Sequence, residues 1–193
     1  MSEERISLSP PRILGLAVFG AVFLTVFDGF HTHSGTTRYP SPVALEAAWW
    51  APLNFALATG LGGPLYVLGY KAAGGKRPPP SWPELTLGFV IFGALYFFSG
   101  FGPVSNAVKL AVLGASAVGL FAWLDRTVAG AVMLLVTALV GPTVESILVH
   151  AGAFEHLKAD VLHVPLWLPG LYACSGPVIG QGARRWLSVG GGG

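Results

Sequence analysis

Histidine and carboxylate side chains are the groups in this sequence best suited to hold a metal ion. Imidazole and carboxylate are both common zinc ligands. The spacing does not favour a metal site, because His31 and His33 are not four residues apart and the sequence has no HExxH or CxxC motif. We therefore expect metal-free interfacial histidines and no resident cofactor. The set comprises His31, His33, His150, His156, His163, Asp28, Glu155 and Asp160.

A second group with chemical potential consists of ionisable residues inside long apolar segments. Residues 104–124 and 128–150 are such segments, and the turn between them predicts an antiparallel hairpin. At a helical rise of about 1.5 Å per residue, Lys109 and Glu145 both lie roughly 26 Å from that turn. Charges inside a membrane usually pair with each other. The sequence therefore predicts a structural ion pair between Lys109 and Glu145.

Motifs for catalysis are absent. There is no GxSxG motif, no phosphate-binding P-loop and no dinucleotide-binding glycine pattern. The one cysteine, Cys174, cannot form an internal disulfide. A net charge of +2 without a basic patch gives no indication of nucleic-acid binding. We expect no catalytic residues and a protein that is not an enzyme, although a small transporter or channel, or a metal-dependent membrane enzyme, stays open as an alternative.

The elements that must position these groups are membrane-spanning helices. The 193 residues are 53% hydrophobic and only 10% charged, with a mean hydropathy of +0.65. Soluble domains average about 25% charged residues, so an ordinary soluble protein is excluded. A spanning helix needs about 20 apolar residues. The chain is predicted to be an all-α, polytopic bundle in a single domain, 1–193, with spans near 13–30, 44–70, 83–101, 104–124, 128–150 and 165–183.

The distribution of Lys and Arg predicts the orientation of the bundle. Basic residues favour the cytoplasmic side. Only Arg38 and Lys158 fall in segments on one side of the predicted spans. The opposite set predicts that both termini are cytoplasmic and consists of Arg5, Arg12, Lys71, Lys76, Arg77, Arg126, Arg184 and Arg185.

Small residues indicate where helices break or pack. Glycines near residues 60–63, with Pro52 and Pro64, predict an interrupted second span. Two small-residue faces allow close helix packing, within the chain or between copies in a homo-oligomer. No convincing internal repeat of the kind found in transporters is visible. The two faces are Ala111, Ala115 and Gly119 in the fourth span and Gly176 and Gly180 in the sixth.

Several short runs, spread in order along nearly the whole chain, carry a family resemblance. They are Ala47–Pro52, Asn106, Phe121–Arg126, Leu148–Phe154, Trp167–Pro169, Ser175–Gly176 and Gly180–Arg184. Together they resemble the Insig (insulin-induced gene) family, membrane proteins that bind oxysterols and restrain sterol synthesis. The very short loops and the Ala- and Gly-rich composition suggest a bacterial homologue, which would lie in the inner membrane, whereas a eukaryotic one would lie in the endoplasmic reticulum.

The resemblance implies a lipid sensor that holds a sterol in a cavity between helices. In a sterol-regulating host its partners would be Scap or the sterol-synthesis reductase. The family's partner-binding Asp carries over to Asp125, which also has the position of a helix N-cap. Val108 stands where the family's sterol-contacting Gln would align, and Phe98–Pro103 replaces a more polar junction. These departures lead us to expect a sterol or a neutral, diacylglycerol-like lipid as the only bound molecule.

A lipid cavity should be an apolar slot with few polar groups. We expect its walls on the third and fourth spans, with Asn106 or Lys109 meeting the hydroxyl group of the lipid near the outer edge of the membrane. The apolar wall candidates are Phe92, Tyr96, Val108, Val112 and Phe121.

Overall fold

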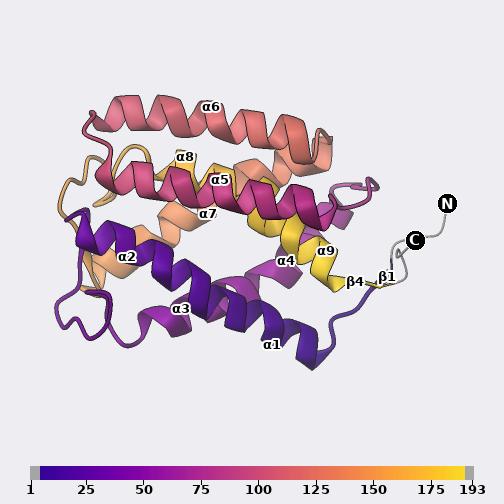
Figure 1. Cartoon of the computed structure of the whole chain (residues 1–193), viewed down its shortest axis with the longest axis horizontal. Helices are drawn as coiled ribbons and strands as arrows, with labels where there is room; N and C mark the ends of the chain where they lie inside the picture. The colour runs from indigo at the N-terminus through magenta and orange to yellow at the C-terminus, as the bar shows by residue number, and fades with distance from the viewer. Residues whose placement is uncertain (1–4, 190–193) are drawn as a thin grey trace.

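The structure is a computed structural model that describes residues 5–189, as helices joined by short loops and two small β-ribbons (Figure 1). In chain order the elements are β1 (Arg5–Ile6), α1 (Pro10–Phe19), the π-helical turn η1 (Gly20–Leu24), α2 (Thr25–His33), β2 (Thr37–Arg38), α3 (Ala51–Gly60), α4 (Gly62–Ala72), α5 (Trp82–Phe101), α6 (Asn106–Leu124), α7 (Val128–His150), β3 (Glu155–His156), α8 (Leu168–Ser175), the π-helical turn η2 (Gly176–Gly180), α9 (Gln181–Leu187) and β4 (Ser188–Val189).

Within residues 5–189, four helical segments are long and apolar enough to cross a membrane individually. One is Pro10–His33, which combines α1, η1 and α2, and the others are α5, α6 and α7. The second and sixth spans are each assembled from shorter helices: α3 with α4, and α8 with η2 and α9. The predicted all-α bundle of six spans is confirmed.

The break in the second span lies at the glycines that predicted it. α3 ends at Gly60 and α4 begins at Gly62, and Leu61 between them has φ −100° and ψ −45°. Pro64 lies in the first turn of α4, where a missing backbone N–H removes no intrahelical hydrogen bond. The glycines rather than the proline therefore interrupt this span.

Helix α8 lies between α6 and α7 and packs closely on both (Figure 1). A Cβ atom on Gly170 of α8 would lie 3.0 Å from Cβ of Leu113 in α6. A Cβ atom on Gly176, which begins η2 directly after α8, would lie 3.3 Å from Cα of Leu134 in α7. Helices approach this closely only where side chains are absent. As a result α6 and α7 touch only slightly, although a tight turn joins them.

The small-residue face on α6 has no packing partner within residues 5–189. Ala111, Ala115 and Gly119 are exposed on α6, and a Cβ atom on Gly119 would meet no other atom within 4 Å. Gly180, in contrast, packs against the ring of Tyr66. The face on α6 is therefore available for contact with another molecule.

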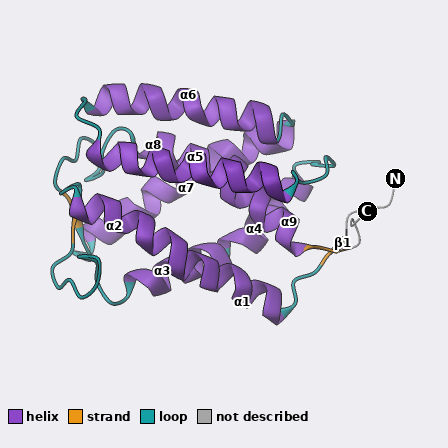
Figure 2. Ribbon diagram, viewed as in Figure 1, coloured by secondary structure: helices purple, strands orange, loops and turns teal. Residues whose placement is uncertain are grey.

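Two antiparallel ribbons close the two ends of the bundle (Figure 2). At one end β1 pairs with β4, so that Arg5 lies opposite Val189. At the other end β2 pairs with β3, and Arg38 lies opposite Glu155. The two ends of the described chain therefore meet at one end of the bundle, and their cytoplasmic location stays a prediction from the positive-inside rule.

The segment before α5 and the segment after α6 have the same arrangement of elements. Equivalent residues of these two repeats are 117 positions apart in the sequence, as Arg38 and Glu155 are. α3 and α8 begin at equivalent positions, each after a tryptophan cap. Trp50 has φ −85° and ψ −12°, and Trp167 has φ −80° and ψ −14°. Because equivalent residues Arg38 and Glu155 pair antiparallel, a local two-fold axis passes through this pair.

The loops of the two repeats have matching backbone conformations. Gly35 and Gly152 have φ 68° and 74° at the ends of α2 and α7. Farther along each repeat, the turn before α3 or α8 contains two consecutive residues with positive φ. These are Leu45 and Glu46 in the first repeat and Leu162 and His163 in the second. Residues 44–50 are thus a loop, and the predicted start of the second span at residue 44 was too early. The inference from the sequence that the chain has no internal repeat was wrong. The repeat is not visible in the sequence because many equivalent side chains differ in chemistry.

Candidate functional site

A pocket of about 360 Å³ opens at the end of the bundle that carries the β2–β3 ribbon. It lies where the junction of α5 and α6 meets the segment after α2 and the loop before α8. Its polar lining residues are Ser34, Thr36, Ser105, Asn106, Lys109 and Lys158. Its other lining residues are Gly100, Phe101, Gly102, Pro103, Val104, Pro165 and Trp167. We call this the outer pocket.

Lys109 is the most buried charged group of the outer pocket, with a relative exposure of 7%. Its Nζ atom donates a hydrogen bond to the carbonyl oxygen of Ser99 at 2.5 Å. The same atom lies 5.9 Å from the centroid of the Trp167 ring, within the range of a cation–π contact. Among residues 5–189, no carboxylate forms an ion pair with Lys109.

Asn106, the first residue of α6, occupies the rim of the outer pocket. Its Nδ2 group donates to Oδ2 of Asp160 at 2.7 Å and to the carbonyl oxygen of Lys158 at 3.2 Å. These bonds join the start of α6 to the loop before α8. The structure therefore brings together Asn106 and Lys109, the two polar residues that the sequence singled out for a lipid head group.

The predicted ion pair between Lys109 and Glu145 does not form. Glu145 instead accepts from Nε2 of His156 at 2.8 Å and from the hydroxyl group of Tyr172 at 2.5 Å. The prediction placed both residues at a similar depth but assumed that α6 and α7 are neighbours. α8, which carries Tyr172, lies between those helices, and its side chain satisfies Glu145 in place of the lysine.

The contact of His156 with Glu145 has an equivalent in the first repeat. There the hydroxyl group of Tyr39 donates to Oδ2 of Asp28 at 2.9 Å. Burial, with the neighbouring Asp28 carboxylate, raises the pKa of Tyr39, so this phenol stays protonated and acts as a donor. In both repeats a residue in the ribbon (His156) or directly after it (Tyr39) therefore donates to a carboxyl group near the end of a span.

The apolar wall predicted on the third and fourth spans does not form a single surface. Phe92 and Tyr96 pack in an aromatic cluster with Phe27, with ring centroids 6.0 and 5.6 Å from the Phe27 ring. Val108 and Val112 lie on an exposed face of α6 and do not join this cluster; they are 46% and 38% exposed.

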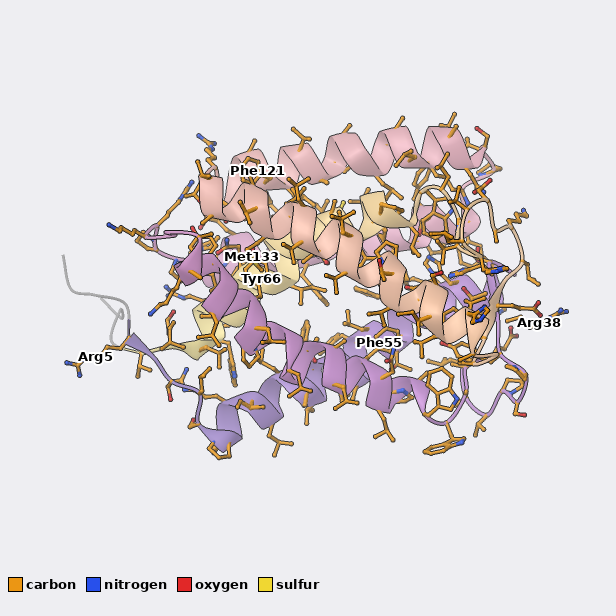
Figure 3. All side chains as sticks on the ribbon, turned by 180° about the vertical axis from the view of Figure 1, so that it is seen from behind. Arg5, Arg38, Phe55, Tyr66, Phe121 and Met133 are labelled. Atoms are coloured by element: carbon orange, nitrogen blue, oxygen red, sulfur yellow. The ribbon has the colours of Figure 1, made fainter. Side chains whose placement is uncertain are left out.

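Phe121 is separated from this region along the bundle axis. It lies toward the end that carries Arg5, away from the end that carries Arg38 (Figure 3). None of the five predicted apolar wall residues lines the outer pocket. Their role in lipid binding stays a prediction.

A second, larger pocket of about 610 Å³ is lined by residues of the β2–β3 ribbon itself, and its Arg38 and Glu155 have opposite charges. Its Arg38 and Glu155 form an ion pair at 2.5 Å, and both side chains are at least half exposed. It is lined by Arg38, Tyr39, Pro40, Val149, Gly152, Phe154, Glu155, His156, Ala159 and His163.

Asp125 lies at the opposite end of the bundle, where it is 1% exposed. Its carboxylate accepts from the hydroxyl groups of Tyr70 and Thr127, at 3.2 and 2.6 Å, and from the Gln181 side-chain amide. The N-cap of α7 is Thr127, whose hydroxyl accepts from the Gly130 N–H, so the N-cap expected at Asp125 was placed two residues too early. The buried carboxylate offers no direct contact surface, and its partner-binding role stays a prediction.

Residues 5–189 contain no group of three or more His, Cys, Asp or Glu side chains arranged to hold a metal ion. The rings of His150 and His163 have centroids 6.4 Å apart. Cys174 is fully buried.

Sequence reasoning missed several lining residues of the outer pocket. Trp167 carried the pattern of an interfacial aromatic residue, but it is 1% exposed and lies beneath the pocket. Lys158 carried a usable signal, because it is one of only two basic residues expected on the outer side. Ser34 and Thr36 carried none, since hydroxyl residues are common in loops.

A six-span bundle with apolar outer faces and polar groups gathered near its ends defines a multi-pass integral membrane protein. No protein-family model matches the chain. Its sequence is similar to insulin-induced gene 1 proteins. It is 27% identical to that of Danio rerio over 179 residues, which cover 90% of this chain and 71% of the relative. The corresponding protein of Gallus gallus is 25% identical over the same share of both chains.

The fold matches that of solved bacterial structures. The mycobacterial Insig homologue MvINS from Mycobacterium vanbaalenii superimposes with a TM-score of 0.80 at 21% identity, covering 94% of this chain and 96% of that one. A cross-linked trimer of MvINS matches with a TM-score of 0.79 over the same shares. The chain is thus Insig-like in sequence and in fold, and the resemblance found in the sequence is confirmed.

Proposed function

We propose that this protein is an Insig-like membrane regulator that responds to a bound lipid and is not an enzyme. The similarity to Insig proteins supports a regulatory role in a membrane. We propose the inner membrane of a bacterium as its location, in keeping with the likeness to a mycobacterial homologue. The lipid candidates are a sterol or a diacylglycerol-like lipid with a small polar head.

The observation that carries this proposal is the outer pocket, which joins buried polar groups to an apolar surface. Lys109 supplies N–H donors for the oxygen atoms of a head group, and the side-chain oxygen of Asn106 can accept from a head-group hydroxyl, since the Asn106 amide N–H groups already donate to Asp160 and Lys158. Phe101 and Val104 line the same pocket and are 38% and 41% exposed, so acyl chains could leave the pocket along them. An amphipathic lipid needs this combination of a polar recess and an open apolar path.

The test is mass spectrometry of lipids that stay bound after purification in a mild detergent, compared with the total membrane extract. We expect one lipid class to be enriched close to one molecule per chain. The enrichment should fall in an Asn106→Ala variant and persist in Val118→Ala, which changes an exposed α6 residue outside the pocket. A lipid profile equal to that of the bulk membrane for the wild-type protein would refute the proposal.

We further propose that the chain forms a homo-oligomer through the small-residue face of α6. Ala111, Ala115 and Gly119 leave this face open, and small residues allow helices from two copies to approach. The structure of MvINS described as a cross-linked trimer supports assembly in a similar protein. Cys174 is buried and is the only cysteine, so Ala115→Cys should give disulfide-linked oligomers while the wild type stays uncross-linked. Cross-linking equal to that of a cysteine at exposed Leu65 would contradict the assignment of the interface.

Asp125 is proposed to take part in partner binding indirectly, because its carboxylate holds the turn between α6 and α7 in place. In a host that regulates sterol synthesis the partners would be Scap or the reductase. A pull-down of the partner by the wild-type protein, but not by a folded variant of the turn, would support this role. Equal recovery with both would contradict it.

The internal repeat is the one observation that favours a transporter instead, since many transporters are built from two related halves. The core between the repeats is closed by buried apolar residues such as Leu113, Ala117 and Leu120 at mid-span. A cysteine-accessibility scan of α6 and α8 from both sides of the membrane distinguishes the two. Labelling of residues throughout a span would favour transport, and labelling confined to the outer third would favour the regulator.

A further inference from the structure

The outer pocket carries two positive charges without a neutralising carboxylate in its lining. Its charged lining residues are Lys109 and Lys158, and none of the lining residues is Asp or Glu. Asp160 lies close by, where its Oδ2 atom accepts from the Asn106 amide and from the Leu166 N–H, each at 2.7 Å, and it forms no ion pair with either lysine among residues 5–189. The ion pairs found among residues 5–189 involve neither lysine.

The ammonium group of Lys109 is only partly satisfied by the protein. A lysine has three N–H donors, and the hydrogen bond to the Ser99 carbonyl uses one of them. At 7% exposure the side chain is more than nine-tenths buried. A buried charge in a membrane protein is expensive unless it is paired, so the remaining donors indicate a partner with negatively charged oxygen atoms.

Other groups around Lys109 also favour an anion. The pocket lies at the beginning of α6, a helix of 19 residues, where the positive end of the helix dipole points. Lys158 lines the rim. The hydroxyl groups of Ser34 and Thr36 also line the pocket, but they hydrogen-bond to each other at 2.8 Å and Ser34 donates to the His31 carbonyl at 3.1 Å. The two ammonium groups can donate to several oxygen atoms of one phosphate.

We propose that the outer pocket binds the phosphate of an anionic diacyl lipid, a phosphatidic-acid-type diacylglycerol phosphate. This inference rests on the proposed lipid-binding function and names the head-group class of the same site. Lys109 contacts the phosphate at the base of the pocket, and Lys158 contacts it at the rim. The exposed Phe101 and Val104 make a membrane lipid a better fit than free phosphate, because they continue the pocket into the apolar surface.

The test is native mass spectrometry of the full-length protein in mild detergent, titrated separately with dioleoyl phosphatidic acid, dioleoylglycerol and dioleoyl phosphatidylcholine. We expect phosphatidic acid to bind one per chain, at least tenfold more tightly than the other two. Lys109→Gln should weaken its binding by about tenfold to a hundredfold, the range expected for a hydrogen bond to a charged group. Lys158→Gln, at an exposed position that should not affect folding, should weaken it by about threefold. Lys76→Gln, a matched loss of charge at the other end of the bundle, should leave binding unchanged.

The outcomes separate the two proposals. Equal binding of phosphatidic acid and dioleoylglycerol, or no effect of both Lys109→Gln and Lys158→Gln, would overturn the anionic head group while the lipid-binding proposal stands. No binding of any of the three lipids, together with no enriched lipid after purification, would overturn both. Inorganic phosphate that displaces phosphatidic acid at equal concentration would show a phosphate site without lipid preference, which also contradicts this inference.

Discussion

Replacing Asp125 by alanine should destabilise the bundle strongly, although the residue lies in a short turn. The carboxylate is 1% exposed and accepts hydrogen bonds from Tyr70, Thr127 and Gln181. In the variant the hydroxyl of Tyr70 can still bond to the Thr127 hydroxyl, 3.1 Å away. The Gln181 amide is left without this acceptor at 0% exposure. Each buried donor left unsatisfied costs about 1–3 kcal/mol, and the vacated space adds to that, so we expect a loss of about 3 kcal/mol.

The network predicts that the isosteric Asp125→Asn variant is also destabilised. One carboxylate oxygen accepts from the Thr127 backbone N–H, at 3.2 Å, and the other accepts from Gln181. Gln181 cannot present its own oxygen instead, because that oxygen accepts from Arg184 at 2.7 Å. An asparagine amide must therefore face a donor in either orientation. We expect a loss of about 1–2 kcal/mol for this variant.

Thermal unfolding in one detergent, followed by tryptophan fluorescence, measures these effects. For a chain of this size about 3 kcal/mol corresponds to a fall in Tm of about 6–12 °C. Glu46→Gln is the control, because the Glu46 side chain is 63% exposed and its His33 partner is 3.8 Å away, so its Tm should stay within about 1 °C. If Asp125→Ala unfolds within about 1 °C of the wild type, the carboxylate does not hold the inner end together and the reasoning fails.

Two further predictions concern helix packing and the pairing of Glu145. Gly170→Ala should cost about 1–3 kcal/mol, because its Cβ atom would press on α6, whereas Gly182→Ala, with no atom within 4 Å, should not destabilise the bundle in the same unfolding assay. Similar losses for both would contradict the packing of α8. A double-mutant cycle should give a coupling of about 1–3 kcal/mol between Glu145 and His156 and less than about 0.5 kcal/mol between Glu145 and Lys109. A larger coupling energy between Glu145 and Lys109 than between Glu145 and His156 would contradict the structure and support the ion pair predicted from the sequence.

The polar residues of the candidate site could be predicted only in part. Asn106 and Lys109 stand out in the sequence because an amide and a charged group are rare within an apolar segment, and both line the outer pocket. Lys158 and Trp167 come from a loop more than 50 residues farther along, as the Asn106–Lys158 contact shows with a separation of 52. No local pattern connects these segments. Phe92 and Tyr96, chosen as cavity walls, are instead held in the core by Phe27.

The internal repeat was hidden for a similar reason. Equivalent positions often share backbone conformation but not chemistry, as with Tyr39 and His156, which donate to Asp28 and Glu145. A hydroxyl and an imidazole can fill the same place because both present a donor to a carboxylate. The sequences therefore diverged where the geometry did not.

Six membrane spans and the position of the break in the second span follow from the amino-acid sequence. These properties are local: hydropathy over about 20 residues sets a span, and closely spaced glycines lower the helix propensity of the segment that contains them. Which helices are neighbours follows only from the packing of the folded chain. α8 lies between α6 and α7 because Gly170, and Gly176 directly after α8, allow close approach to both helices. As a result Glu145 accepts a hydrogen bond from His156, and Lys109 lines the outer pocket without a carboxylate partner among residues 5–189. Depth along a helix can be counted from the sequence, but the facing partner depends on close packing between segments that are distant in the chain.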